Sequence, residues 1–167
     1  MPKRAVSGAM LLAAGLVLGY FAGTWSAGRR LLPPVTPVIV GEAGLAFAAR
    51  LDSGAVVSSI NAQDVAVEGG GGRPGRADVG RTVRFVLVNE AGERRALSAP
   101  IAAVRGIRMA DCREVRYHVW LTIIHRGRAH RVLTNLNDRS GTADKLLLGR
   151  NWLRHGHAVA PPEEAEI

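Results

Sequence analysis

The chain has 167 residues, 47% of them hydrophobic, and a formal net charge of +8 at pH 7. That length predicts a single domain with a modest core. Aromatic residues make up only 5% of the chain, too few for a surface that stacks bases, so the positive charge does not indicate a nucleic-acid partner. Cys112 is the only cysteine, which excludes an intrachain disulfide.

The uncharged segment at residues 5–28 is long enough to cross a bilayer. As a helix, about 24 residues extend roughly 36 Å, compared with a hydrocarbon core of about 30 Å. Tyr20 and Trp25 lie near its outer end, where interfacial aromatic residues are common. The segment exceeds a usual signal-peptide core, and Trp25 occupies the place of the first alanine in an A-x-A cleavage site. We therefore expect residues 1–30 to form an uncleaved membrane anchor, with a cleaved signal peptide as the alternative.

Basic residues flank this segment on both sides. Lys3, Arg4 and the α-amino group slightly outweigh Arg29 and Arg30, which favours an inner-membrane protein with its C-terminal domain in the periplasm. The basic residues of that domain are almost all arginine. Codon bias in a GC-rich genome explains this pattern, and so does a surface that binds carboxylates, which arginine contacts in a bidentate manner.

Residues 31–37 contain three prolines and are expected to form an extended linker. Residues 38–155 predict an all-β domain, because short apolar segments alternate with turn sequences. Residues 115–123 alternate strictly, and the following His-Arg-Gly-Arg is expected to return the chain into a second strand. Many short strands at close spacing indicate a small closed barrel or a sandwich. Residues 156–167 are expected to form an acidic, flexible tail.

The tripeptide Asp52-Ser53-Gly54 lies between two apolar segments and is the candidate catalytic turn. Aspartic peptidases use two carboxylates that share one proton, one acting as general base on water and the other as general acid on the leaving amine. Each carboxylate lies in an Asp-Ser/Thr-Gly turn, beneath which an apolar-apolar-Gly segment packs. This chain has one such turn and one late segment, Leu147–Gly149, so it supplies one half-site. A second chain would have to complete the pair, and taken alone the tripeptide is also typical of an ordinary turn.

From about residue 38 to residue 153 the chain resembles the bacterial retropepsin-like aspartic peptidases, a family also labelled ATP-dependent zinc proteases. Several segments carry the resemblance and keep the order and spacing of the family. They are the D-T-G-A-K-T-S-like Asp52–Ser58, the W-V-R-F-like Thr82–Phe85, the E-x-P-like Leu97–Pro100, and the L-x-D-R-S…L-L-G-R block at Leu136–Gly141 and Leu146–Arg150.

The resemblance implies a membrane-anchored aspartic endopeptidase with a retropepsin-type β-barrel that acts as a homodimer. Its substrate would be a peptide or protein, and a glutamate-rich one is a candidate because some relatives trim glutamate tails from a ribosomal protein. By this similarity Asp52 would be the catalytic acid–base residue. The residues expected to support the site or to bind substrate are Ser53, Gly54, Ala55, Arg139, Ser140, Gly149 and Arg150.

Three positions depart from the family pattern. Val56 and Val57 replace a lysine and a threonine, and Asn61 replaces a histidine. If the lost polar residues tune the aspartate or bind substrate, the chain is altered in specificity or inactive. Three interpretations stay open: an active peptidase, a non-catalytic module of the envelope that binds peptides, and a structural envelope domain in which the tripeptide is only a turn.

We expect no metal and no other cofactor. The sequence contains no H-E-x-x-H motif, no cysteine cluster and no P-loop. The near-clusters of metal-ligating residues are His155 with His157 and His125 with His130. We interpret these histidines as surface or turn residues.

Overall fold

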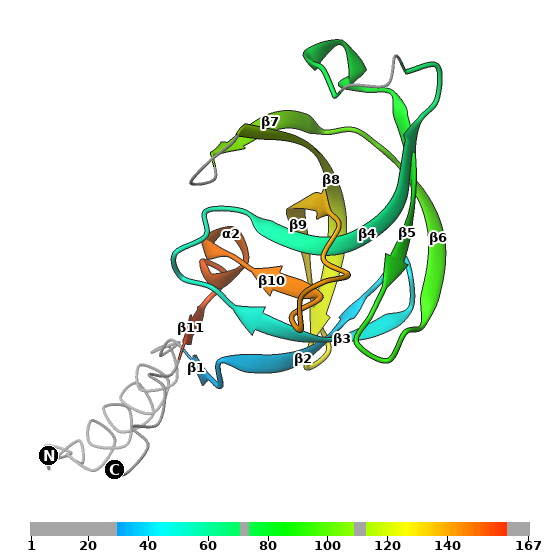
Figure 1. The fold of residues 1–167 in the computed structure, drawn as a ribbon. Helices are drawn as coiled ribbons and strands as arrows, with labels where there is room; N and C mark the ends of the chain where they lie inside the picture. Colours follow the sequence, from blue (N-terminus) through cyan, green and yellow to red (C-terminus); the bar gives the residue numbers. More distant parts are fainter. Residues whose placement is uncertain (1–29, 71–73, 109–112, 160–167) are drawn as a thin grey trace, which may run out of the picture.

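The computed structural model describes residues 30–70, 74–108 and 113–159, which form a predominantly β domain (Figure 1). The predicted anchor lies outside the described residues except for Arg30, as does the predicted tail beyond Val159. Within the described ranges, no helix has the length and apolar character needed to cross a membrane. The elements are β1 (Arg30–Leu32), β2 (Val35–Val40), β3 (Leu45–Leu51), β4 (Ser58–Val67), the 3-10 turn η1 (Arg76–Asp78), β5 (Thr82–Val88), β6 (Arg94–Pro100), β7 (Ala103–Arg108), β8 (Arg113–His125), β9 (Arg128–Asn137), β10 (Leu146–Leu148), α2 (Arg150–Leu153) and β11 (His157–Val159).

Strands β10, β3, β2, β8, β9 and β4 close into a barrel, so the expectation of a closed β-barrel is confirmed. The ring closes because β10 pairs with both β3 and β4. It is a mixed ring, since β10 runs parallel to β3 and β4 runs parallel to β9, whereas the other neighbours are antiparallel. Closure removes unpaired edges and holds the end of β3 and the start of β4 on either side of β10.

Two long strands carry the elements outside this ring. The second half of β8 pairs with β9, while its first residues pair with β7 in a hairpin. In the same way β4 pairs with β9 at Ser58–Asn61 and with β5 from Ala62 onward, and β6 then pairs with β5. Figure 1 shows the β7–β8 hairpin arching away from the barrel above β4. The two extensions therefore face each other on one side of the molecule.

Alternating apolar residues form the interior of the barrel. β3 buries every second residue from Leu45 to Leu51. β8 buries Val119, Leu121 and Ile123, which the sequence pattern placed on one face. Burying a side chain of this size stabilises the fold by about 1.5–3 kcal/mol. His125–Arg128 forms the predicted turn into β9, with Arg126 and Gly127 at positive φ as a two-residue hairpin requires.

Both ends of the barrel domain are more regular than the composition suggests. β2 begins at Val35, inside the segment expected to be a linker, and pairs with β3 along its whole length. β1 pairs in parallel with β11, which lies inside the segment expected to be a tail. In the β1–β11 pair the two strands are far apart in sequence, and the β2–β3 pair depends on the strand that follows β2. The proline content and polarity of either segment alone therefore do not predict these pairings.

Candidate functional site

Asp52 directly follows β3 and begins the connection to β4, residues 52–57, which we call the aspartate loop. Its backbone N–H donates to Leu148 O at 2.9 Å, because β10 lies alongside the end of β3. Its carboxylate Oδ1 accepts the N–H groups of Gly54 at 2.9 Å and Ala55 at 3.1 Å. Oδ2 has no hydrogen-bond partner among the described residues. The side chain is half-buried, so one carboxylate oxygen is fixed and the other is available for chemistry.

Gly149 packs directly against the aspartate loop, as the late apolar-apolar-Gly segment predicts. A Cβ at this position would lie 2.9 Å from Ala55 O and 3.0 Å from the carbonyl carbon of Val57, closer than side-chain carbons approach such atoms. The N–H of Arg150 donates to Ala55 O at 2.8 Å, which joins the two segments. The glycine is required here for space, because its φ of −84° is open to any residue.

Ser58 and Asn151 form a buried link beside this contact that the sequence analysis missed. Asn151 Oδ1 accepts the N–H of Ser58 at 3.0 Å and its hydroxyl at 2.9 Å, while Ser58 Oγ accepts the N–H of Gly149 at 3.1 Å. Asn151 Nδ2 donates to Leu133 O at 2.7 Å. Their positions in the sequence could have indicated a role, since Ser58 ends the segment Asp52–Ser58 and Asn151 directly follows the segment Leu146–Arg150. The link joins the aspartate loop, α2 and β9.

Arg150 covers the outer side of the aspartate loop. Its Nη1 donates to Ser53 O at 3.2 Å and to Gly54 O at 3.4 Å. The side chain is exposed, and the two carbonyls belong to the exposed tip of the loop. Arg150 therefore supports the loop from outside, and Ser53, Gly54, Gly149 and Arg150 are all brought together around Asp52.

Arg139 approaches the same site from the loop between β9 and β10. Its N–H donates to Asn61 Oδ1 at 2.8 Å and its Nε to Asp144 O at 2.7 Å. Partial burial lowers the pKa of Arg139, and the nearby carboxylates of Asp144 and Asp52 act in the opposite direction. Arginine stays charged after a modest lowering of this kind. A positive charge thus lies within electrostatic reach of Asp52.

Asn61 has a structural role at the position where the family has a histidine. It is buried, and its Nδ2 donates to Val88 O at 3.0 Å while its Oδ1 holds the backbone of Arg139. Val56, which replaces a lysine, is 60% exposed at the edge of the aspartate loop. The departure at Asn61 is therefore built into the fold, whereas the departure at Val56 leaves an apolar side chain in solvent.

Ser140 is not drawn into the contacts around Asp52. It is exposed, and its N–H donates to Asp138 Oδ1 at 2.9 Å. Hydrogen bonds from its hydroxyl and its N–H lower the pKa of Asp138. Lys145 Nζ donates to the carbonyls of Arg139, Ser140 and Thr142 at 2.7–3.0 Å, a contact the sequence did not indicate. Ser140 and Lys145 therefore shape the loop that presents Arg139.

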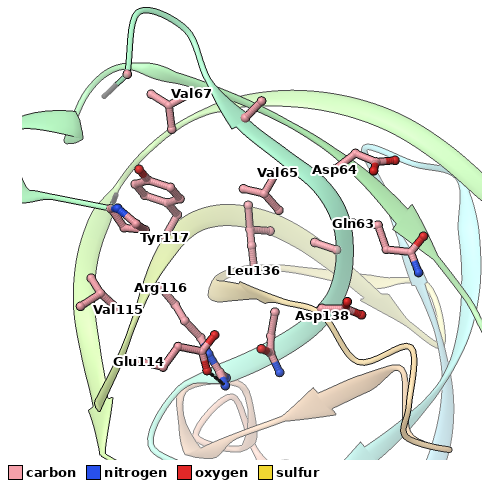
Figure 2. A pocket seen from close by; sticks show the side chains of 15 residues that line it. Gln63, Asp64, Val65, Val67, Glu114, Val115, Arg116, Tyr117, Leu136 and Asp138 are labelled. Carbon is pink, nitrogen blue, oxygen red and sulfur yellow. Dashed lines mark hydrogen bonds and ion pairs between the residues drawn. The ribbon is translucent and has the colours of Figure 1, made fainter. Parts of the chain in front are cut away.

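A cavity of about 710 Å³ lies between the two extensions of the barrel (Figure 2). β4 lines it with residues 62–67 and β8 with residues 114–117, and residues 136–138 close it beside Arg139. Within it Arg116 forms an ion pair with Glu114 and donates to Asn135 Oδ1 at 3.4 Å. This cavity has the size to hold a peptide segment, but no residue of the aspartate loop lines it.

A second groove, of about 440 Å³, begins at Val56 and Val57 and is strongly basic. No carboxylate lines it, and none of its four arginines forms a salt bridge with the residues that the structure describes. The Arg131 guanidinium lies over the ring of Trp120, 5.2 Å from its centroid. We call this second groove the arginine groove. Its arginines are Arg105, Arg131, Arg150 and Arg154.

His125 borders the predicted turn into β9, but at 5% exposure it is a buried residue and not a surface one. It ends β8 and faces inward toward Trp152, a contact between segments that are far apart in sequence. In the ranges that the structure covers, no group of three or more His, Cys, Asp or Glu side chains is arranged to hold a metal ion.

The closed barrel, the Asp-Ser-Gly loop at the end of an inner strand and the glycine segment packed against it define a retropepsin-like fold. The RimB-like family, described as retropepsin-like aspartic endopeptidase RimB, matches residues 37–167, and the chain belongs to this family. The curated proteins contain no match to the chain.

A solved structure with the same fold is Lpg0085 (DUF785) from Legionella pneumophila subsp. pneumophila str. Philadelphia 1, a protein of unknown function. It is 21% identical, with a TM-score of 0.62 over 80% of this chain and 94% of that chain. At this identity the likeness bears on the fold alone.

Proposed function

We propose that this protein is an aspartic endopeptidase with Asp52 as its acid–base residue. The observation that carries the proposal is the geometry of the Asp52 carboxylate. One oxygen is held by two backbone N–H groups, and the other is without a partner in the described part of the chain. Membership of a family of aspartic endopeptidases supports the same assignment.

The chemistry requires a second carboxylate in contact with the first, because only a pair that shares one proton supplies both a base and an acid. No other carboxylate forms a hydrogen bond with Asp52 in the described residues. We propose that Asp52 of a second copy completes the site in a two-fold symmetric dimer. The ionised carboxylate would take a proton from a water molecule while the water oxygen attacks the peptide carbonyl carbon. The protonated carboxyl group of the other chain would then give its proton to the leaving amine.

The proposed substrate class is acidic, glutamate-rich peptide. Arg139 carries a positive charge close to Asp52, and the arginine groove begins in the aspartate loop itself. Unneutralised guanidinium groups bind carboxylates with good geometry, which favours glutamate side chains over neutral ones. The proposed location is the periplasmic face of the inner membrane, supported by the uncharged segment at residues 5–28 and its basic flanks.

The alternative proposal is an envelope module that binds peptides without cleaving them. Two of the departures from the family support it, since exposed Val56 cannot supply the charge of a lysine and Asn61 is occupied in holding the Arg139 loop. Such a module would keep the cavity and the arginine groove but would not turn over substrate.

The test compares Asp52→Asn with Glu68→Gln in the full chain, using a general peptide library and glutamate-rich peptides. Glu68 is the matched control, because it is an exposed carboxylate whose ion-pair partner Arg84 is also exposed. Cleavage by the wild type and by Glu68→Gln, lost in a folded Asp52→Asn, supports the peptidase. Cleavage that survives in Asp52→Asn contradicts it, and binding without cleavage by the wild type favours the alternative.

A further inference from the structure

Four of the five histidines meet beside α2, at a place that the proposed peptidase site does not use. The rings of His130 and His155 stack at 4.4 Å, while His157 lies 5.9 Å from His130 and 5.8 Å from His125. β8, β9, the turn after α2 and β11 each contribute to this group. We call His125, His130, His155 and His157 the histidine cluster.

The cluster attaches β11 to the barrel through Trp152. The His157 ring stacks on the fully buried Trp152 at 4.2 Å with an angle of 15° between the planes, and His125 meets the same indole edge-on at 5.9 Å. His157 is the first residue of β11, and its backbone pairs with Arg30 of β1. Packing at His157 therefore holds both terminal strands in place.

Several buried nitrogen atoms in the cluster have no hydrogen-bond partner among the described residues. They are Nε2 of His125, both ring nitrogens of His157 and Nε1 of Trp152. Buried polar atoms are usually paired, and an unpaired one costs about 1–3 kcal/mol. Among the described residues, the ring of His157 therefore has no partner that would stabilise a proton on it, and the ring of His125 has one only at Nδ1.

Positive groups face the cluster, and no carboxylate contacts it in the described part of the chain. Burial lowers the pKa of His157, and His125, His130, His155 and Arg128 lower it further. Burial also lowers the pKa of His155, with smaller contributions from His130 and Arg154. β2 contributes only the carbonyl of Pro37, 3.3 Å from Nδ1 of His125. Positive charge on a neighbouring ring therefore disfavours protonation of His155 and of His157.

The ring arrangement favours a role for protons over one for a metal ion. Ring nitrogens direct their lone pairs in the ring plane, so the near-parallel rings of His130 and His155 do not converge on one ion. No set of three ligands is arranged for a metal in the described ranges. Imidazole changes charge just below neutral pH, which is the range in which such a cluster responds.

We propose that the histidine cluster is a proton-operated latch that holds β11 and β1 on the barrel at neutral pH and releases them in mild acid. The sign follows from the pKa shifts of His155 and His157. Because the folded-state values lie below the ordinary 6.5, the folded state binds fewer protons than the unfolded state, and stability falls as the pH drops below 6.5. The inference does not depend on peptidase activity.

The test is amide hydrogen exchange of the full chain at neutral pH and at about pH 5.5, corrected for the intrinsic effect of pH on exchange. We expect the backbone of β1 and β11 to exchange about tenfold faster in acid than the correction predicts, with β3 and β10 unchanged. The double variant His130→Gln, His155→Gln removes two imidazole rings that are not fully buried, and it should reduce this response. His118→Gln, which changes the histidine outside the cluster, should keep it.

Three results would overturn the latch. One is an acid response of equal size in the double variant, and another is no selective response of β1 and β11 in the wild type. The third is stoichiometric binding of Zn²⁺ at neutral pH that the double variant abolishes, because the cluster would then be a metal site.

Discussion

The carboxamide oxygen of Asn151 accepts two hydrogen bonds from Ser58, one from its backbone N–H at 3.0 Å and one from its hydroxyl at 2.9 Å. Ser58 is the residue at which the aspartate loop becomes β4, and Asn151 lies in α2. The pair therefore fixes the far end of the loop, while Asp52 itself fixes the near end through Leu148 O. The candidate catalytic residue is held by the fold from both sides.

Asn151→Ala should lower the free energy of unfolding by about 3 kcal/mol. The change removes the acceptor of the Ser58 N–H and O–H and the side-chain donor to Leu133 O, while Ser58 Oγ still accepts from Gly149; an unpaired buried group costs about 1–3 kcal/mol. Asn151→Asp keeps the oxygen that accepts from Ser58 but replaces the donor to Leu133 O by a second acceptor, so a smaller loss than in Asn151→Ala would come from the accepting oxygen. Urea unfolding of both variants measures the difference, and equal losses would contradict the role given to the accepting oxygen.

Gly149→Ala should destabilise the protein by about 1–3 kcal/mol and displace the aspartate loop, because its Cβ would overlap Ala55 O and the backbone of Val57. Gly141→Ala is the matched control. No atom lies within 4 Å of a Cβ built there, so its unfolding free energy should change by less than about 0.5 kcal/mol. Similar losses in the two variants would mean that close packing at Gly149 is not what the loop requires.

Arg150→Ala should loosen the aspartate loop without unfolding the barrel. The two hydrogen bonds to Ser53 O and Gly54 O are exposed, so the unfolding free energy should fall by less than about 1 kcal/mol. Amide exchange in residues 53–55 should rise by up to about fivefold, because local opening of the loop no longer has to break those two hydrogen bonds. Arg84→Ala, at an exposed ion pair on β5, serves as control. If amide exchange in residues 53–55 is the same in Arg150→Ala and in the wild type, Arg150 does not support the aspartate loop.

Tyr117 makes a pH-dependent contribution at the alkaline end. Its hydroxyl donates to Asp78 Oδ2 at 2.9 Å, and burial together with this contact raises the pKa of Tyr117 from 10.0 to about 12. A raised value means that the contribution is complete below pH 10 and is lost as the pH rises toward 12. Urea unfolding across this range should show the loss in the wild type, and Tyr117→Phe should show a flatter profile. Identical slopes in the two proteins would contradict the assignment.

Local patterns predicted the elements whose partners are close in sequence. The alternation along β8 and the turn at His125–Arg128 identify the β8–β9 hairpin. β10 could not be predicted in the same way, because its three residues have no usable period and its partners β3 and β4 are distant in the chain. Barrel closure depends on that short strand, so composition indicated the class of fold but not how the ring closes.

The same distinction applies to the site. Asp52 and Gly149 belong to a pair of motifs with a known spatial relation, so their contact could be expected from the sequence alone. Asn61 and Asn151 are polar residues typical of turns, and only burial shows that they hold the framework of the site. His125 and His157 are separated by a hairpin and by α2, and the return of the chain after α2 brings them together.

The central claim is that two copies of Asp52 form one catalytic site. It is tested most directly by mixing wild-type chain with Asp52→Asn chain at constant total concentration, under conditions that allow subunits to exchange, and measuring peptide cleavage. If both aspartates are needed, only pairs of wild-type chains are active, and an equal mixture should retain about a quarter of the activity. Retention of about half, in direct proportion to the wild-type chain, would mean that one chain holds a complete site and would contradict the account.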